Sequence, residues 1–217
     1  MTHVLITGCN RGIGRAMAEA ALARGWQVTG TSRQEVDLPG VTLLDVEMDS
    51  IGDLPAAFDG LPPLDLLINN AGIIGPEQQS TREMDFAGFR HTLTVNVLAP
   101  LAVSQACLPA LGQRAGSRIL SVSSQMSWMG YRKSDRIAYR ASKAALNKVM
   151  QGLATDLEPD GITVALVDPG WVRTDMGGPD ADEDPEGVAE GILSLADRLT
   201  LRDTGRFFRF TGEEREF

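Results

Sequence analysis

The residues best suited to chemistry stand in the stretch YRASKAALNKVM (139–150), where Tyr139 and Lys143 lie four positions apart. Side chains at this spacing share a helix face, so the phenol and the ammonium should point the same way. An ammonium about 4 Å away stabilises a phenolate by about 4 kcal/mol at an effective dielectric of ~20. That is roughly three pKa units below the ordinary tyrosine value of ~10, before desolvation, which acts in the opposite direction. The pair predicts a tyrosine that exchanges protons near neutral pH, although the spacing alone is equally typical of a surface pair.

Two further polar residues could hydrogen-bond a substrate or a water molecule near the tyrosine. Ser124 lies in SVSSQMS (121–127), at the end of an expected strand, and its hydroxyl could hydrogen-bond a carbonyl oxygen. Asn96 lies inside a long apolar helical pattern, where a buried amide needs partners. We expect Asn96 to hold a water molecule next to Lys143.

A glycine-rich loop, TGCNRGIG (7–14), follows the first apolar run and opens the first helical pattern. Glycines let the backbone approach a phosphate, and the helix N-terminus beyond them offers free N–H groups to a pyrophosphate. The loop lacks the Gly-Lys-Ser/Thr ending of a nucleoside triphosphate site. The small residues of NNAG (69–72) could lie against the same cofactor, and Asp45 could meet an adenine amino group.

Short apolar runs alternate with longer helical patterns along the whole chain. Strands are expected at 3–8, 26–32, 41–46, 64–69, 118–123 and 163–168. Helices are expected at 12–25, 50–58, 83–112 with a break at Pro100, and from between 134 and 139 to about 157. This alternation predicts one α/β domain over residues 1–217, a Rossmann-type, doubly wound parallel sheet of about seven strands flanked by helices. Ligands of such sheets bind beyond the carboxyl ends of the strands.

Composition narrows the function classes. The net charge of −9 argues against a nucleic-acid partner, because such binding is driven by Lys and Arg. No uninterrupted apolar run reaches the ~18–20 residues of a membrane span, and the start MTHVLITG does not resemble a signal peptide, so we expect a cytoplasmic protein without a membrane partner. Cys9 and Cys107 are expected to be free thiols, and no metal site is expected.

Taken together and in order, these motifs and DPGWVRTDM (168–176) resemble the short-chain dehydrogenase/reductase family over nearly the whole chain. The stretches YRASKAALN and PGWVRTDMGGPDA are most similar to its C-factor-like branch, which is related to the sniffer-type carbonyl reductases. The resemblance implies that Tyr139 exchanges the proton, that Ser124 orients the carbonyl and that Asn96 supports a proton relay. Lys143 would lower the tyrosine pKa and bind the nicotinamide ribose.

The resemblance also implies a nicotinamide cofactor and a small carbonyl or alcohol substrate. The expected cofactor-binding residues are Gly8, Asn10, Arg11, Gly12, Ile13, Gly14, Ser32, Arg33, Asp45, Val46, Asn70, Ala71, Gly72, Tyr139, Lys143, Pro169, Gly170, Val172 and Thr174. NADP(H) should be preferred over NAD(H), because Ser32 and Arg33 replace the acidic residue that usually binds the ribose of NAD. Arg11 should join Arg33 at the 2′-phosphate.

Two departures from the family pattern matter. The segment between Ser124 and Tyr139 is slightly longer than usual, which leaves Ser123 and Ser127 as weaker candidates for the serine role. The region after Met176 is short, which predicts an open substrate pocket.

The motifs are compatible to different degrees with three functions. An NADP-dependent carbonyl reductase or alcohol dehydrogenase is favoured over a nucleotide-binding signalling or sensor protein with weak turnover, because a pure sensor has no need of the tyrosine. A serine hydrolase is disfavoured by the absence of a G-x-S-x-G turn. The segments 83–112 and 139–157 carry many small apolar residues, such as Ala102, Ala106, Ala141, Ala144 and Ala145. Because related folds pair these two helices across a two-fold axis, the resemblance implies a homodimer or homotetramer.

Overall fold

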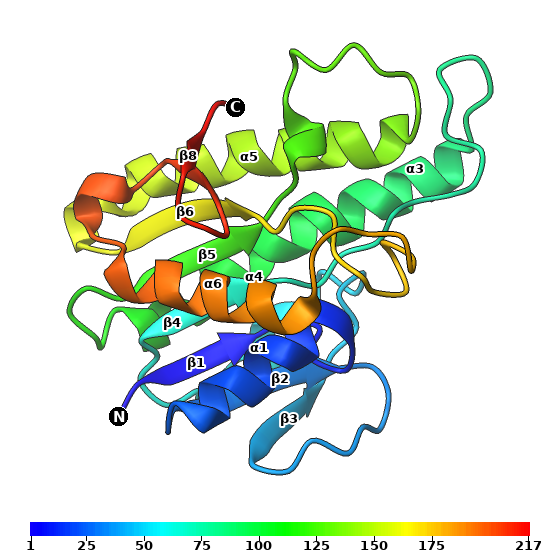
Figure 1. The fold of residues 1–217 in the computed structure, drawn as a ribbon. Helices are drawn as coiled ribbons and strands as arrows, with labels where there is room; N and C mark the ends of the chain where they lie inside the picture. Colours follow the sequence, from blue (N-terminus) through cyan, green and yellow to red (C-terminus); the bar gives the residue numbers. More distant parts are fainter.

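The computed structural model describes all residues 1–217 and contains one twisted sheet covered by helices on both faces (Figure 1). The strand order is β3-β2-β1-β4-β5-β6-β7-β8, and every neighbouring pair is parallel except β7 and β8. The strands are β1 (His3–Ile6), β2 (Gln27–Ser32), β3 (Val41–Asp45), β4 (Leu66–Asn69), β5 (Arg118–Val122), β6 (Thr163–Asp168), β7 (Phe207–Arg209) and β8 (Glu214–Arg215). The predicted Rossmann-type fold is confirmed, with one strand more than expected.

Two layers of helices bury the two faces of the sheet. Helices α1 (Gly12–Ala23) and α6 (Pro185–Arg198) pack together on one face, in a core shared with alternate residues of the central strands. The other face is covered by α2 (Leu54–Ala57), α4 (Ala99–Leu111) and α5 (Ile137–Leu157), and α3 (Phe86–Leu93) packs against α5. Because both faces are covered, the strands are almost continuously apolar, which is why they are easily recognised in the sequence.

The long helical pattern expected at 83–112 is divided close to Pro100. A π-helical turn, Thr94–Leu98, joins α3 to α4, and Pro100 lies in the first turn of α4. Because the helix runs on without a gap, Pro100 has no N–H to donate to the carbonyl oxygen of Asn96 one turn earlier, and the departure from α-helical geometry lies directly before the proline, where the break was expected. Asn96 lies within the π turn, and π turns occur frequently at functional sites.

The same stretch, Phe86–Leu111, is long and apolar enough to cross a bilayer by length and composition, with a mean hydropathy of 1.4 in its most apolar window. The expectation that no segment would qualify was wrong, because it considered only uninterrupted apolar runs. Half of this window is buried inside the fold, as in the core helix of a globular domain.

The chain contains no helix between Met176 and α6, and the openness of the substrate pocket stays a prediction. After α6 it forms a short helix (Leu201–Asp203) and the hairpin of β7 and β8, which extends the sheet beyond β6. The turn of this hairpin therefore lies beside the carboxyl end of β6, where the N–H of Phe210 donates to the carbonyl oxygen of Asp168 and where ligands bind in this fold class.

Candidate functional site

Helix α5 brings Tyr139 and Lys143 together inside the protein. Their side chains share one helix face, and the residues are only 9% and 5% exposed. Lys143 Nζ lies 5.7 Å from the centre of the Tyr139 ring and donates a hydrogen bond of 2.8 Å to the carbonyl oxygen of Val122, at the end of β5. The burial of both residues argues against the interpretation as a surface pair.

Burial also decides the acidity of the pair. It raises the pKa of Tyr139 to about 12, assisted by the negative charge of Asp168 and opposed by a hydrogen bond with Ser124 and by the charge of Arg136. It lowers the pKa of Lys143 to about 8. The expected fall in the tyrosine pKa was therefore wrong for this structure, because the desolvation of the phenolate outweighs the attraction to nearby cations. At neutral pH the phenol keeps its proton and can donate it.

Of the three candidate serines, Ser124 is the one that hydrogen-bonds the Tyr139 side chain. The other two hydroxyls are engaged elsewhere. Ser123 Oγ donates to Asn147 Oδ1, and Ser127 Oγ accepts from Asn147 Nδ2 at 2.8 Å. Ser124 Oγ accepts from the N–H of Met126 at 3.1 Å and still has its own hydrogen to donate. Ser124 therefore remains the candidate to share a carbonyl oxygen with Tyr139, although Ser123 and not Ser124 lines the cavity described below.

Asn96 is fully buried, and all the polar atoms of its side chain have protein partners. Its Nδ2 donates to the carbonyl oxygen of Ile73 at 2.8 Å and to Ser142 Oγ at 2.9 Å, and its Oδ1 accepts from the N–H of Ile73 at 2.8 Å. Ser142 Oγ in turn donates to the carbonyl oxygen of Tyr139 at 2.7 Å. Asn96 thus fixes the backbone after β4 to α5, while its role in a proton relay stays a prediction.

Gln79 is a site residue that the sequence analysis missed. Its Oε1 accepts from the N–H of Tyr139, and its carbonyl oxygen accepts from the N–H of Ile137, both at 3.1 Å. Arg136, the residue before α5, has a left-handed backbone (φ 51°) and offers no side-chain cap. Gln79 supplies the missing acceptors, and its own Nε2 is held by the carbonyl oxygen of Pro76 at 2.7 Å.

Replacing Gln79 with Leu should therefore weaken the start of α5. The N–H of Tyr139 would lose its acceptor in a buried place, at a cost of about 1–3 kcal/mol in the free energy of unfolding, and turnover should fall with it. Urea unfolding and kcat are the measurements. Gln78→Leu is the matched control, because the Gln78 side chain is exposed and makes no hydrogen bond. Equal effects of the two substitutions would refute the role of Gln79.

The glycine loop forms a backbone cradle at the start of α1. Gly8 and Gly12 have positive φ angles of 68° and 54°. A side chain on Gly14 would collide with the carbonyl oxygen of Gly8 and with Asn70 Nδ2. The N–H groups of the first turn of α1 have no protein acceptor, and this turn contains neither an acidic residue nor a side-chain cap. Exposed donors at a helix N-terminus fit an anion.

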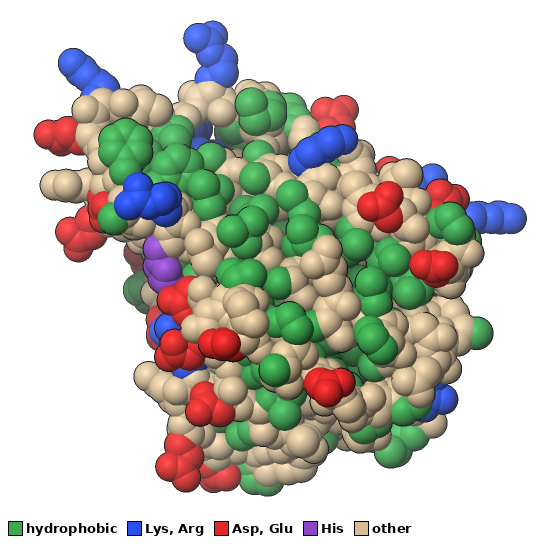
Figure 2. All heavy atoms as spheres, turned by 180° about the vertical axis from the view of Figure 1, so that it is seen from behind, with side chains coloured by type: hydrophobic (Ala, Val, Ile, Leu, Met, Phe, Trp, Pro, Cys, Tyr) green, Lys and Arg blue, Asp and Glu red, His purple; other side chains and the backbone are tan.

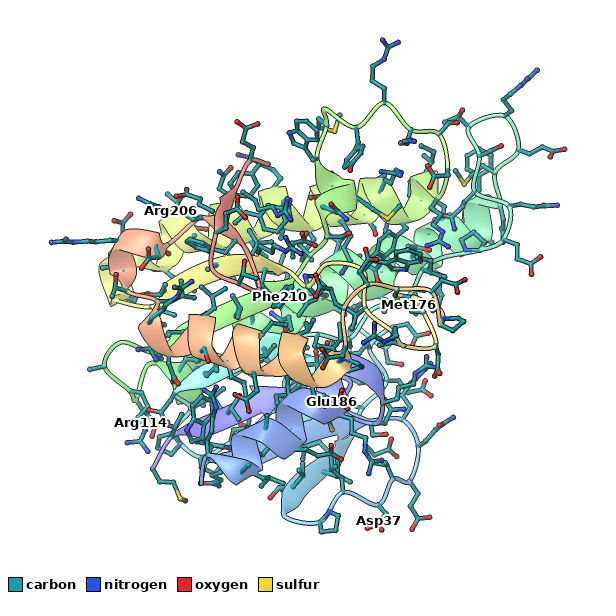
Figure 3. All side chains as sticks on the ribbon, in the orientation of Figure 1. Asp37, Arg114, Met176, Glu186, Arg206 and Phe210 are labelled. Atoms are coloured by element: carbon teal, nitrogen blue, oxygen red, sulfur yellow. The ribbon has the colours of Figure 1, made fainter.

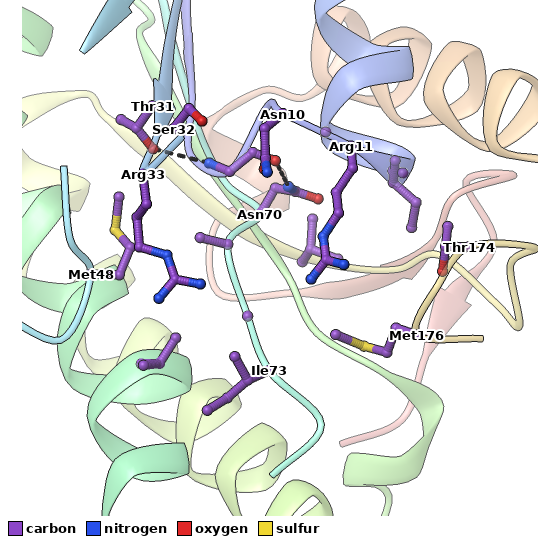
Figure 4. Close-up of a pocket in the computed structure, with 18 of the residues that line it drawn as sticks. Asn10, Arg11, Thr31, Ser32, Arg33, Met48, Asn70, Ile73, Thr174 and Met176 are labelled. Atoms are coloured by element: carbon purple, nitrogen blue, oxygen red, sulfur yellow. Dashed lines mark hydrogen bonds between the residues drawn. The ribbon is translucent and has the colours of Figure 1, made fainter. Parts of the chain in front are cut away.

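This cradle opens into a cavity of about 370 Å³ that extends from the end of β2 to α5 (Figure 4). The expected residues that line it are Gly8, Asn10, Arg11, Gly12, Ile13, Gly14, Ser32, Arg33, Val46, Asn70, Ala71, Gly72, Tyr139, Lys143, Pro169 and Thr174. Lining residues that were not expected include Thr31, Gln34, Met48, Asp49, Ile73, His91, Asp175 and Met176. Sequence motifs on five separate strand ends thus meet in one cavity.

Five expected site residues do not line the cavity: Asn96, Ser124, Asp45, Gly170 and Val172. Asn96 and Ser124 lie behind it, in the contacts described above. Asp45 is exposed at the end of the edge strand β3, and Asp49 lines the cavity in its place.

The other two expected residues that do not line the cavity, Gly170 and Val172, lie in the turn after β6. Val172 is buried and paired with Glu183, and Gly170 packs against the side chain of the same Glu183. Both residues therefore support the cavity wall without forming its surface.

The two expected phosphate-binding arginines approach the cavity from different elements (Figure 4). Arg33 follows β2, is exposed and makes no ion pair or side-chain hydrogen bond. Arg11 lies in the glycine loop, and its guanidinium forms an ion pair of 2.8 Å with Asp175. Arg33 is therefore free to bind an anion, whereas Arg11 is already paired with the carboxylate of Asp175.

Known proteins are similar to this chain in sequence and in fold. A family model described as short chain dehydrogenase matches residues 2–185. The C-signal of Myxococcus xanthus is 43% identical over 153 residues, which cover 70% of this chain and 92% of that protein. The carbonyl reductase Sniffer of D. melanogaster is 27% identical, with a TM-score of 0.91 and 100% of both chains covered. An NADPH-bound carbonyl reductase from chicken fatty liver is 27% identical, with a TM-score of 0.90, 100% of this chain and 99% of that chain covered.

These matches agree with the sheet order, the glycine cradle and the buried pair on α5. They also support the predicted proximity to the C-factor-like and carbonyl reductase branch. The chain belongs to the short-chain dehydrogenase family of oxidoreductases.

Proposed function

We propose that the protein is an NADP(H)-dependent carbonyl reductase, which transfers a hydride between the nicotinamide and a small carbonyl or alcohol substrate. The observation that carries the proposal is the buried, protonated Tyr139, hydrogen-bonded with Ser124 at one end of a cavity whose other parts form a phosphate cradle. Sequence similarity alone does not supply this argument, since the same fold supports proteins of several functions.

Each residue of the site has a separate role in the proposed reduction. When bound, NADPH supplies the hydride. Ser124 Oγ and the Tyr139 hydroxyl hydrogen-bond the carbonyl oxygen, and Tyr139 donates its proton to that oxygen as charge develops there. Lys143 has three donors, of which Val122 takes one, so the others remain for the ribose hydroxyls and the forming phenolate.

The raised pKa of Tyr139 favours the reductive direction at neutral pH. Reduction needs the phenol in its protonated form, whereas oxidation of an alcohol needs the phenolate. Because the pKa lies at about 12, oxidation should grow steadily as the pH rises above neutral.

A second candidate is supported by the similarity to C-signal: a nucleotide-binding signalling protein with weak turnover. A set of aliphatic and aromatic aldehydes and ketones, each incubated with NADPH, separates the two functions. Loss of the reduced-nicotinamide absorbance at an enzymatic rate with any of them supports the reductase. NADPH binding without turnover of any compound supports the signalling protein.

We also propose that the protein is at least a dimer. The alanines expected to form the interface, Ala102, Ala106, Ala141, Ala144 and Ala145, are all partly exposed, so they do not merely face the sheet. Figure 2 shows hydrophobic side chains across the centre of the face opposite α1 and α6. Light scattering at micromolar concentration should give a mass at least twice the 23.3 kDa of one chain. Ala145→Glu should reduce that mass, and a monomeric wild type would contradict the proposal.

A further inference from the structure

Asp168, the last residue of β6, joins two loops of the site. Its carboxylate is fully buried, and Oδ1 accepts from the N–H groups of Gln125 and Gly170, both at 3.1 Å. Gln125 directly follows Ser124, and Gly170 lies in the turn after β6, next to Pro169 of the cavity wall. The position of the Asp168 carboxylate therefore affects both the loop that carries Ser124 and the turn that carries Pro169.

The second oxygen of this carboxylate faces the C-terminal hairpin. Arg215 of β8 places its Nη2 3.2 Å from Asp168 Oδ2, with side chains that are 30% and 1% exposed. The N–H of Phe210 donates to the carbonyl oxygen of Asp168 at 2.9 Å. Phe210 marks this junction between the hairpin and the end of β6 in Figure 3. Arg215 is the only cation that forms an ion pair with Asp168.

A second ion pair attaches the other end of the same cavity wall. Arg209 of β7 donates to Glu183 Oε1 at 2.7 Å. Glu183 pairs through its backbone with Trp171 and Arg173, so it fixes the segment that carries Thr174. The hairpin thus holds the segment between β6 and α6 at both ends, although none of its residues lines the cavity.

We propose that the C-terminal β7–β8 hairpin is a positioning element of the carbonyl-reducing site, in which Arg215, through Asp168, sets the placement of the Ser124 loop and of the turn after β6. The inference rests on the proposed function for its catalytic consequence. Its electrostatic consequence is independent of turnover, because Asp168 also acts on Tyr139.

The charged groups that act on Tyr139 come from three elements. Lys143 lies on α5, Arg136 immediately before it, and Asp168 on β6, while Ser124 contributes a hydrogen bond. The negative charge of Asp168 raises the pKa of Tyr139. Arg215 forms an ion pair with Asp168, so we expect its positive charge to offset part of this effect. Removing Arg215 should therefore raise this pKa, and removing the charge of Asp168 should lower it.

The chain contains only two tyrosines, Tyr131 and Tyr139, which permits a direct test. Fluorotyrosine, whose phenol is more acidic, is incorporated at both positions, and ¹⁹F NMR follows the titration, with Tyr131→Phe assigning the signals. We expect the Tyr139 signal to titrate at higher pH in Arg215→Met and at lower pH in Asp168→Asn. The double variant should behave as Asp168→Asn, because no charge is left for Arg215 to offset. Arg215→Lys should restore most of the wild-type titration.

Arg206→Met is the matched control, because Arg206 forms an exposed ion pair of 3.2 Å with Glu214 on the same hairpin and does not contact Asp168. In the reductase assay, Arg215→Met should lower kcat about tenfold, because the Ser124 loop and the turn after β6 lose their placement, while Arg206→Met should leave kcat unchanged. If Arg215→Met merely unfolds more easily, with a Tyr139 titration identical to that of Arg206→Met, the positioning role is overturned. If no variant or wild type reduces any carbonyl while the titrations shift as expected, the proposed function fails and the contact through Asp168 stands.

Discussion

Replacing Tyr139 with Phe is expected to abolish carbonyl reduction while leaving the affinity for NADPH nearly unchanged. The ring is buried on α5, so phenylalanine fills the same space, and only the hydroxyl that carries the transferable proton is lost. General acid catalysis contributes about 10²–10⁴-fold, so kcat should fall by at least that factor. Steady-state kinetics give kcat, and the fluorescence of bound NADPH gives the dissociation constant.

Two companion variants make this result specific. Tyr131→Phe, on the exposed loop before α5, should retain wild-type kcat, because Tyr131 does not line the cofactor cavity. Lys143→Ala should damage both kcat and NADPH affinity, since Lys143 lines the cavity beside Tyr139. Retention of most of the wild-type rate by Tyr139→Phe would show that another group is the acid.

Replacing Arg33 with Asp should reverse the preference between NADPH and NADH. The guanidinium of Arg33 is exposed at the cavity with no counter-charge, and its planar fork suits a phosphate. One charge-assisted contact contributes about 1.5–3 kcal/mol, which is roughly a tenfold to hundredfold preference for NADPH in the wild type. Aspartate removes this attraction, repels the 2′-phosphate and offers an acceptor to the ribose hydroxyl of NADH. Dissociation constants of both cofactors for both proteins measure the reversal.

The contribution of Arg11 can be separated from that of Arg33. Because Arg11 is paired with Asp175, Arg11→Ala should reduce the NADPH preference less than Arg33→Ala does. Equal dissociation constants for NADPH and NADH in the wild type would mean that neither arginine binds the 2′-phosphate.

Local patterns were sufficient to predict the sheet and the glycine cradle. Strands buried on both faces appear as continuous apolar runs, and the spacing of Gly8, Gly12 and Gly14 between a strand and a helix is a local signal. Tyr139 and Lys143 were paired correctly for the same reason, because four residues of one helix fix their relative direction.

What the sequence could not predict depends on tertiary contacts. The sign of the Tyr139 pKa shift was wrong because burial, which outweighs the nearby cations, is a property of the whole fold. Gln79 caps a helix that begins far away in the chain, and no local pattern marks it. The hairpin of β7 and β8 was missed because strands of three and two residues carry no periodic signal.

The transfer of deuterium from NADPH labelled at the transferable position of the nicotinamide tests the central claim most directly. Wild-type protein is incubated with the labelled cofactor and the set of carbonyl compounds, and the products are analysed by mass spectrometry. The account predicts an alcohol that carries deuterium at its former carbonyl carbon with the wild type and with Tyr131→Phe, and none with Tyr139→Phe. Tight binding of the labelled cofactor without deuterium in any product would contradict it and would favour the signalling protein.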